Sequence, residues 1–188
     1  MKTRTEALAL LKEYNSEDHL LKHAYAVEAV MRRFAREFGE DEEYWGIVGL
    51  LHDLDYEKWP DQHCIKTGEL LRENGFEEAF IHAVMSHGYG ICCDVKPELK
   101  MELVLYTIDE LTGLIMASAL MRPGRSIIGM ELKSLKKKFK DKRFAAKVDR
   151  ELIAGGAELL ALPLETVMQL SIEGMTEAAE ALGLAGEN

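Results

Sequence analysis

Apolar residues that recur at three- and four-residue steps are the feature of this sequence that most constrains its fold. In the clearest case, five residues share one helical face, which are Leu20, Val27, Val30, Phe34 and Phe38. No segment alternates apolar and polar residues long enough to predict a β-strand. Only 4 prolines occur in 188 residues, and alanine, leucine, glutamate, lysine and methionine, which favour helices, are common. The sequence therefore predicts an all-α fold.

Capping residues and helix-breaking residues predict where the helices begin and end. Thr3 followed by Glu6 is a capping box that begins a first helix ending near Tyr14. Gly39 is expected to end the second helix, and Asp41 to begin the third. Further helices are expected at about 16–38, 41–51, 64–73, 77–87, 97–122, 129–140, 142–161 and 164–182. The segments LHDLDYEKWPD and GYGICCDVKP are expected to be loops.

Length and composition fit one domain over residues 1–188, because hydrophobic residues make up 47 % of the chain. No internal repeat or low-complexity linker interrupts the sequence. The only candidate break is MRPGRS at 121–126. We expect a core at about 16–121 and a helical C-terminal extension at about 126–184.

The net charge of −10 argues against binding to polymeric nucleic acid, because backbone phosphates require a cationic surface. Three cysteines without a CxxC pair fit a reducing compartment, so a cytoplasmic location is expected. No membrane association is predicted. The most apolar stretch, Met101 to Met121, contains Glu102, Asp109 and Glu110, and we interpret it as a buried helix.

Two adjacent polar residues, His52 and Asp53, lie where an apolar helix is expected to end and a polar loop to begin. An imidazole nitrogen and a carboxylate oxygen are suitable ligands for a divalent ion. A polar helix C-cap is the alternative interpretation of this pair. His23 lies on the apolar face of the preceding helix, where a single histidine is more often a hydrogen-bonded core residue.

Asp109 is harder to explain as a structural residue. It lies one turn from Leu105 and Thr112, in the most apolar segment of the chain. A carboxylate in such a place costs several kcal/mol unless it is paired or bound to a metal. The segment from Met101 to Met121 contains no lysine or arginine, so a partner must come from another part of the chain. An ion pair and a bound metal both meet this requirement.

The order His23, His52-Asp53, Asp109 resembles the signature of the HD-domain superfamily of metal-dependent phosphohydrolases. The resembling segments are LLKHAYAVEAV, GLLHDLDYEKWP, HCIKTGELLRENG, AVMSHGYG and LYTIDELTG, which together span roughly residues 16–117. The later segments LIMASALMRPG and ELKSLKKKFKDKRFAAKVDRE resemble a small family of uncharacterised hydrolases within that superfamily.

The resemblance implies a helical bundle with C-terminal helices packed against it and a divalent ion at its centre, held by His23, His52, Asp53 and Asp109. The ion would be Mn, Fe, Mg, Ni, Co or Zn. The expected reaction is hydrolysis of a phosphate ester of a nucleotide or similar small metabolite by water that the metal activates. A two-metal phosphodiesterase or oxygenase of the same superfamily is one alternative. A non-catalytic metal- or nucleotide-binding regulatory protein is another.

The resemblance also gives functions to His63 and His87, beside the catalytic Asp53. Members with two metals place extra histidines at similar points, and members with one metal use such residues to contact phosphate or protonate the leaving group. We therefore expect His63 and His87 in the same cavity as Asp53, as catalytic residues or as ligands of a second ion. Exposed histidines at helix ends are the alternative. His19 and His82 are expected at the surface.

The remaining charged residues near the signature and in the C-terminal part are mostly expected to be solvated. Asp55 is as compatible with a function in the site as with a solvated loop, whereas Glu57 is expected to be solvated. The basic run at 133–143 is typical of the solvated face of an amphipathic helix. One or two of its lysines, with Arg122 or Arg125, are expected at the mouth of the site. Cys92 and Cys93 are interpreted as reduced structural thiols.

Overall fold

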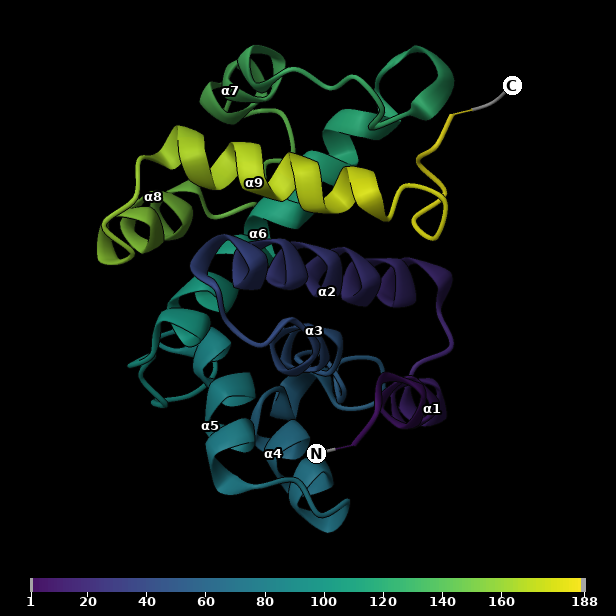
Figure 1. The fold of residues 1–188 in the computed structure, drawn as a ribbon, viewed down its shortest axis with the longest axis vertical. Coiled ribbons are helices and arrows are strands. Elements are labelled where there is room, and N and C mark those ends of the chain that lie inside the picture. Colours follow the sequence, from purple (N-terminus) through teal and green to yellow (C-terminus); the bar gives the residue numbers. More distant parts are fainter. Residues whose placement is uncertain (1, 187–188) are drawn as a thin grey trace.

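A computed structural model describes residues 2–186, which contain nine α-helices, three short 3-10 helices and no β-strand (Figure 1). The α-helices are α1 (Arg4–Tyr14), α2 (Asp18–Phe38), α3 (Glu42–Leu50), α4 (Ile65–Glu73), α5 (Glu78–Met85), α6 (Lys100–Leu120), α7 (Leu132–Lys140), α8 (Arg150–Leu159) and α9 (Leu164–Glu177). The 3-10 helices are η1 (Pro60–Gln62), η2 (Ser86–Gly88) and η3 (Pro123–Arg125). The all-α prediction is confirmed.

The predicted caps of the first three helices are present. Thr3 and Glu6 form a reciprocal capping box at the start of α1. Gly39 ends α2 in a left-handed conformation with φ of 71°. The Asp41 side chain accepts a hydrogen bond from the backbone N–H of Tyr44 and so caps α3.

Both α6 and α8 begin later than predicted, and a capping contact explains each. α6 begins at Lys100 instead of near residue 97, because the Glu102 carboxylate accepts hydrogen bonds from the backbone N–H groups of Glu98 and Leu99. α8 begins at Arg150 instead of at 142, because Asp149 is its N-cap. The turns before it are held by the Arg150 guanidinium, which donates to the carbonyls of five residues, Phe139, Asp141, Phe144, Ala145 and Val148.

The central element of the fold is α2, which packs against α3, α6 and α9. Figure 1 shows α9 on one side of α2, and α3 with α4 and α5 on the other. Two glycines allow the helix backbones to approach closely. A Cβ at Gly49 of α3 would lie 3.1 Å from the Val27 carbonyl oxygen, and one at Gly174 of α9 would lie 2.9 Å from the Ala29 carbonyl oxygen. The close contact at Gly49 fixes α2 and α3 relative to each other. These two helices lead into the candidate site.

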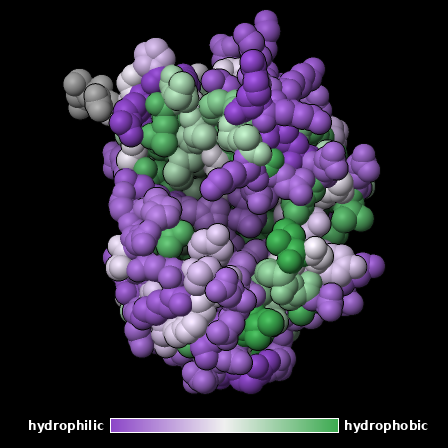
Figure 2. Space-filling view, turned by 180° about the vertical axis from the view of Figure 1, so that it is seen from behind, coloured by the Kyte–Doolittle hydropathy of each residue, from purple (hydrophilic) through white to green (hydrophobic). Residues whose placement is uncertain are grey.

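By length and composition α6 is long and apolar enough to cross a membrane. In this fold it lies inside the molecule, packed against α2, α5, α7, α8 and α9. The prediction of a buried helix is therefore confirmed. The face of the molecule in Figure 2 is mostly hydrophilic and carries separate apolar patches.

The C-terminal helices pack directly on the N-terminal ones. α9 lies along α2, and α8 lies on α6 with Gly156 against the Thr107 side chain. Residues 121–126 therefore connect two parts that share one hydrophobic core. On these contacts we propose that residues 1–188 form one domain, with a core at about 16–121 and an extension at about 126–184.

Candidate metal centre

Three elements bring the four predicted metal ligands together. His23 comes from α2, His52 and Asp53 from the turn that follows α3, and Asp109 from α6. Nε2 of His23 lies 3.1 Å from Nε2 of His52 and 2.9 Å from Oδ1 of Asp109. Nε2 of His52 lies 3.3 Å from the same Asp109 oxygen. The ligand atoms of His23, His52 and Asp109 all lie within 4.8 Å of one another.

Asp53 joins this group to a second one. Its Oδ2 lies 3.4 Å from Nε2 of His52 and 3.6 Å from Nε2 of His23. Its Oδ1 lies 3.3 Å from Nε2 of His63 and 3.6 Å from Nε2 of His87. The two oxygens of one carboxylate thus face two separate pairs of imidazoles. The structure brings His63 and His87 into the cavity of Asp53, as their position in the sequence predicts.

The second nitrogen of three of these imidazoles is held by an acceptor. Nδ1 of His52 donates to the Gly49 carbonyl at 2.8 Å, and Nδ1 of His87 donates to the Val84 carbonyl at 2.6 Å. Nδ1 of His63 donates to Oδ1 of Asp55 at 2.8 Å. Carbonyl and carboxylate oxygens can only accept, so each Nδ1 carries the proton. The Nε2 lone pairs are therefore directed at the cluster, as in histidines that ligate metals.

The donor set fits a divalent cation. Two pairs of imidazoles face each other through Nε2 at 3.1 Å, namely His23 with His52 and His63 with His87. In the pair of His63 and His87, where both Nδ1 atoms carry the proton, neutral imidazoles would direct two lone pairs at each other. A cation between nitrogen and carboxylate donors removes that repulsion, and this mixed set suits Zn, Fe, Mn, Ni or Co. His23, His52, Asp53 and Asp109 would hold one ion, and Asp53, His63 and His87 a second.

The pKa values of His52, Asp53 and Asp109 are strongly shifted by their neighbours in the cluster. Burial disfavours charge on His52, but Asp53 and Asp109 outweigh it and raise the His52 pKa well above its ordinary value. Burial likewise opposes ionisation of Asp53, yet His52, His87 and His23 hold its pKa well below the usual range. The pKa of Asp109 is lowered in the same way, against burial, by His23 and His52. The cluster thus favours carboxylate anions that a cation or a proton must balance.

The cluster lies in a cavity of about 390 Å³. Its walls also include residues that bear no predicted function, which are His19, Leu20, Tyr56, Ile91, Gly113 and Val148. Val148 comes from the turns before α8, so the C-terminal extension contributes to the wall of the cavity. Within residues 2–186 no lysine or arginine lines it. The expectation that Arg122, Arg125 or a lysine of the basic run reaches the mouth of the site is therefore wrong.

The basic residues are occupied elsewhere. Arg122 donates to the carbonyls of Ser126, Ile128 and Gly129 and so orders the turn after η3. Lys136 forms an ion pair with Glu165 at 2.8 Å. The interpretation of the basic run as a solvated helical face agrees with this placement.

Two acidic residues of the turn after α3 have structural partners. Asp55 is fully buried, and its Oδ2 accepts from the backbone N–H of Thr67 at 2.8 Å while Oδ1 holds His63. Glu57 is not simply solvated as predicted, because its carboxylate accepts hydrogen bonds from both backbone and hydroxyl of Ser16 and from the backbone of Glu17. It thereby ties the turn that carries Asp53 to the start of α2.

Three other residues make contacts that the sequence did not predict. His82 is only half-exposed, because its Nδ1 contacts Oε1 of Glu102 at 2.9 Å. His19 is exposed as predicted but lies at the mouth of the cavity, one turn before His23. Glu110 also lines the cavity, and burial together with the adjacent Asp109 raises its pKa. Because His19 lies one helical turn before His23, helical spacing could have predicted that both side chains face the same cavity.

Comparison with known protein families matches more than half of the chain to a family model. The model of the family described as HD domain matches residues 20–128, which include every residue of the two clusters. No solved structure matches the chain.

Proposed function

Because the chain belongs to the HD domain family, we propose that it is a metal-dependent phosphohydrolase that cleaves a phosphate ester of a nucleotide or similar small metabolite. The observation that carries this proposal is the convergence of four Nε2 atoms and two carboxylates in one cavity. A divalent ion held there would polarise a phosphoryl oxygen and lower the pKa of a bound water. Members of this family are typically metal-dependent phosphohydrolases.

The chain's own residues would orient the reacting groups. Asp53 lies between the two imidazole pairs, so it can accept a proton or hold an attacking water by hydrogen bonding. His63 and His87 face the same carboxylate and are suited to contact the phosphoryl group or the leaving oxygen. No lysine or arginine of the described chain lines the cavity, so the positive charge opposite a phosphate must come from imidazolium groups or bound cations.

The cavity also favours a small substrate. Its volume of about 390 Å³ is in the range of small-molecule sites. Leu20, Tyr56 and Ile91 give one part of the wall an apolar surface that suits a base or another apolar group. The net charge of −10 disfavours a nucleic-acid polymer or an anionic membrane as partner. We further propose that the protein acts in the cytoplasm, where its three free cysteines remain reduced.

A two-ion centre is the second candidate, and one observation favours it. Asp53 directs one oxygen to each imidazole pair, which is how a carboxylate shared between two ions is arranged. A two-metal phosphodiesterase and a two-iron oxygenase both use such a centre. Two ions per chain with release of phosphate would favour the first, and oxygen consumption by iron-loaded protein the second.

The test is metal analysis of freshly purified protein followed by a screen of phosphate esters for release of inorganic phosphate. We expect a bound transition metal and turnover of at least one nucleotide or metabolite ester. The matched control is Asp109→Ala, which removes one donor and should lose both metal and turnover. Metal-loaded protein that hydrolyses no phosphate ester in a broad panel would contradict the proposal.

A further inference from the structure

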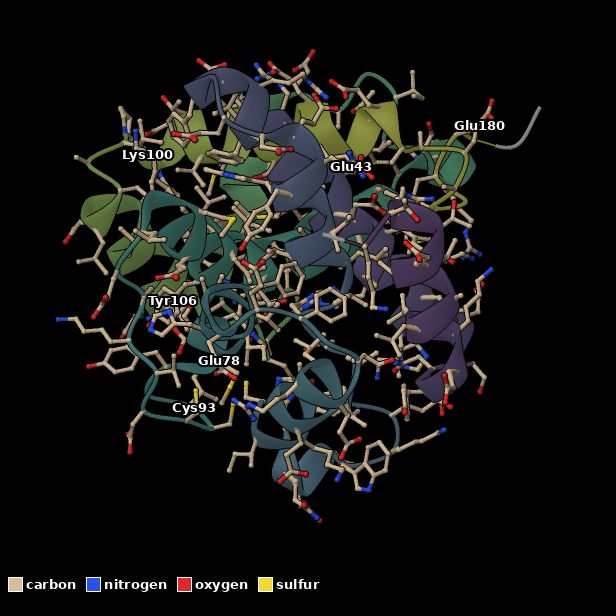
Figure 3. All side chains as sticks on the ribbon, turned by 60° about the horizontal axis from the view of Figure 1, so that its bottom comes forward. Glu43, Glu78, Cys93, Lys100, Tyr106 and Glu180 are labelled. Atoms are coloured by element: carbon tan, nitrogen blue, oxygen red, sulfur yellow. The ribbon has the colours of Figure 1, made fainter. Side chains whose placement is uncertain are left out.

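Two thiols lie beside the imidazole pair of His63 and His87. Sγ of Cys64 lies 3.0 Å from Sγ of Cys92 and 3.8 Å from Nε2 of His87. One ring nitrogen of His63 and the two sulfur atoms all lie within 4.8 Å of one another. Figure 3 shows several sulfur atoms gathered next to the labelled Cys93. The sulfurs therefore form a third group of donors at the wall of the cavity.

The backbone is shaped to bring these sulfurs together. Cys64 precedes α4 with φ of +66°, a left-handed conformation that is costly for a residue with a side chain. It is completely buried, whereas Cys92 lies in the loop after η2 and lines the cavity. A Cβ at Gly88 would lie 2.4 Å from each of the two sulfur atoms. Only glycine at this position leaves room for the pair.

A hydrogen bond between two thiols does little to offset this backbone strain, because S–H is a weak donor and sulfur a weak acceptor. As thiolates, the same atoms are strong ligands of thiophilic ions. His63 completes the set, since its Nδ1 is held by Asp55 and its Nε2 faces the cavity, where it also lies near His87 and Asp53.

We propose that His63, Cys64 and Cys92 form a thiolate-containing site for a thiophilic divalent ion of the Zn²⁺ class. This inference rests on the proposed function in one respect, because His63 is shared with the group of Asp53 and His87. The ion position on that side of Asp53 thus has sulfur donors that Mg²⁺ and Mn²⁺ bind poorly, and it selects Zn²⁺, Fe²⁺ or Co²⁺. The His23, His52 and Asp109 position has only nitrogen and oxygen donors.

In the experiment, reduced, metal-free protein is titrated with Co²⁺, and its absorption spectrum is recorded at each step. Thiolate bound to Co²⁺ gives an ultraviolet charge-transfer band, which nitrogen and oxygen ligands do not give. We expect the band in the wild type. In Cys92→Ser one of two sulfur ligands remains, so the intensity of the band should fall to about half. In the double variant Cys64→Ser/Cys92→Ser the band should be lost. Cys93→Ser is the matched control and should keep the full band, because Sγ of Cys93 points to the Met85 carbonyl at 3.2 Å.

The outcomes separate this inference from the proposed function. Visible Co²⁺ absorption without a charge-transfer band would overturn the thiolate site and leave the nitrogen and oxygen centre in place. The variant His23→Ala/Asp109→Ala should keep the band, because it alters only the other group. If the double variant does not fold, as judged by circular dichroism, the comparison of Cys92→Ser with the wild type still decides. A Cys64–Cys92 disulfide that forms in the presence of Co²⁺ as fast as without it would also overturn the proposal.

Discussion

Nδ1 of His63 donates a hydrogen bond to Oδ1 of the fully buried Asp55 at 2.8 Å, and this contact fixes which ring nitrogen faces the cavity. Burial opposes a charge on His63, yet Asp55 and Asp53 outweigh it and raise the His63 pKa. Asp55 itself does not line the cavity. It is therefore a positioning residue that acts through His63.

Asp55→Asn should weaken metal binding by about 10–100-fold, the usual effect of losing such a partner of a ligand histidine. Both oxygens of Asp55 accept hydrogen bonds, from His63 and from the Thr67 backbone. An asparagine must turn its NH₂ group against one of these donors. Affinity for Co²⁺ or Zn²⁺, measured by competition with a chelator, checks this. Thr67→Val removes the hydroxyl that accepts a hydrogen bond from the Asp55 backbone N–H at 3.2 Å, and it leaves the contact between Asp55 and His63 in place. It should keep metal affinity, so equal losses in both variants would contradict a positioning function.

Asp53→Ala should abolish hydrolysis in a protein that remains folded. The variant removes the carboxylate that faces both imidazole pairs, so binding and orientation are lost together. We expect turnover to fall by on the order of a thousandfold or more. Circular dichroism and phosphate release would be measured on the same samples. Asp61→Ala, an exposed aspartate in η1, is the control that should retain activity. Turnover like that of the wild type in folded Asp53→Ala would refute the metal-centred mechanism.

Removal of metal should lower the melting temperature, and added Mn, Fe, Ni or Zn should restore it. An ion present at 100 times its dissociation constant adds about 2.7 kcal/mol to the stability of a protein that binds it only when folded. Differential scanning fluorimetry with and without a chelator measures the shift. His19→Ala, at the mouth of the cavity, should keep the shift, and Asp109→Ala should lose it. Identical melting curves with and without each ion would argue against a resident metal.

The parts of the site that could be predicted are those with a local signal. Asp109 is a carboxylate in an apolar helix, and His52-Asp53 is a polar pair at the end of one, so each is conspicuous within a few residues of sequence. The helix caps are local in the same way. Thr3 with Glu6 and Asp41 at α3 were therefore placed correctly.

The contacts that escaped prediction join residues far apart in the chain. In the sequence, Glu57 looks like any solvated loop charge. Its partners Ser16 and Glu17, which lie just before α2, are some forty residues away in the chain. His82 and Glu102 are 20 residues apart. The segment 142–148 has the composition of a helix, but its carbonyls bind Arg150 instead of helical N–H groups. Local sequence therefore does not distinguish a charged residue that has a buried partner from one that is solvated.

Charge reversal at Lys136 and Lys138 should leave turnover and the Michaelis constant within about twofold of the wild type, since exposed charges outside a site act weakly. Lys136 pairs with Glu165, and Nζ of Lys138 lies 4.1 Å from the centroid of the Phe144 ring. Neither lysine lines the cavity. Steady-state kinetics of Lys136→Glu/Lys138→Glu on the best ester checks this. A large rise in the Michaelis constant would show that the basic run binds substrate.

Glu57→Gln should destabilise the protein at neutral pH and much less in acid. Hydrogen bonds from the backbone of Glu17 and Ser16 and from the Ser16 hydroxyl hold the pKa of Glu57 below its ordinary value. A carboxyl whose pKa is lowered by folding contributes stability above its ordinary pKa, and this contribution is lost as the pH falls through the lowered value. The urea midpoints of wild type and variant should therefore differ at neutral pH and converge below the ordinary pKa of glutamate. Glu40→Gln, which replaces an exposed glutamate, should leave the midpoint unchanged at every pH. A Glu57→Gln midpoint equal to that of the wild type at neutral pH would mean that these hydrogen bonds do not hold the turn of Asp53 to α2.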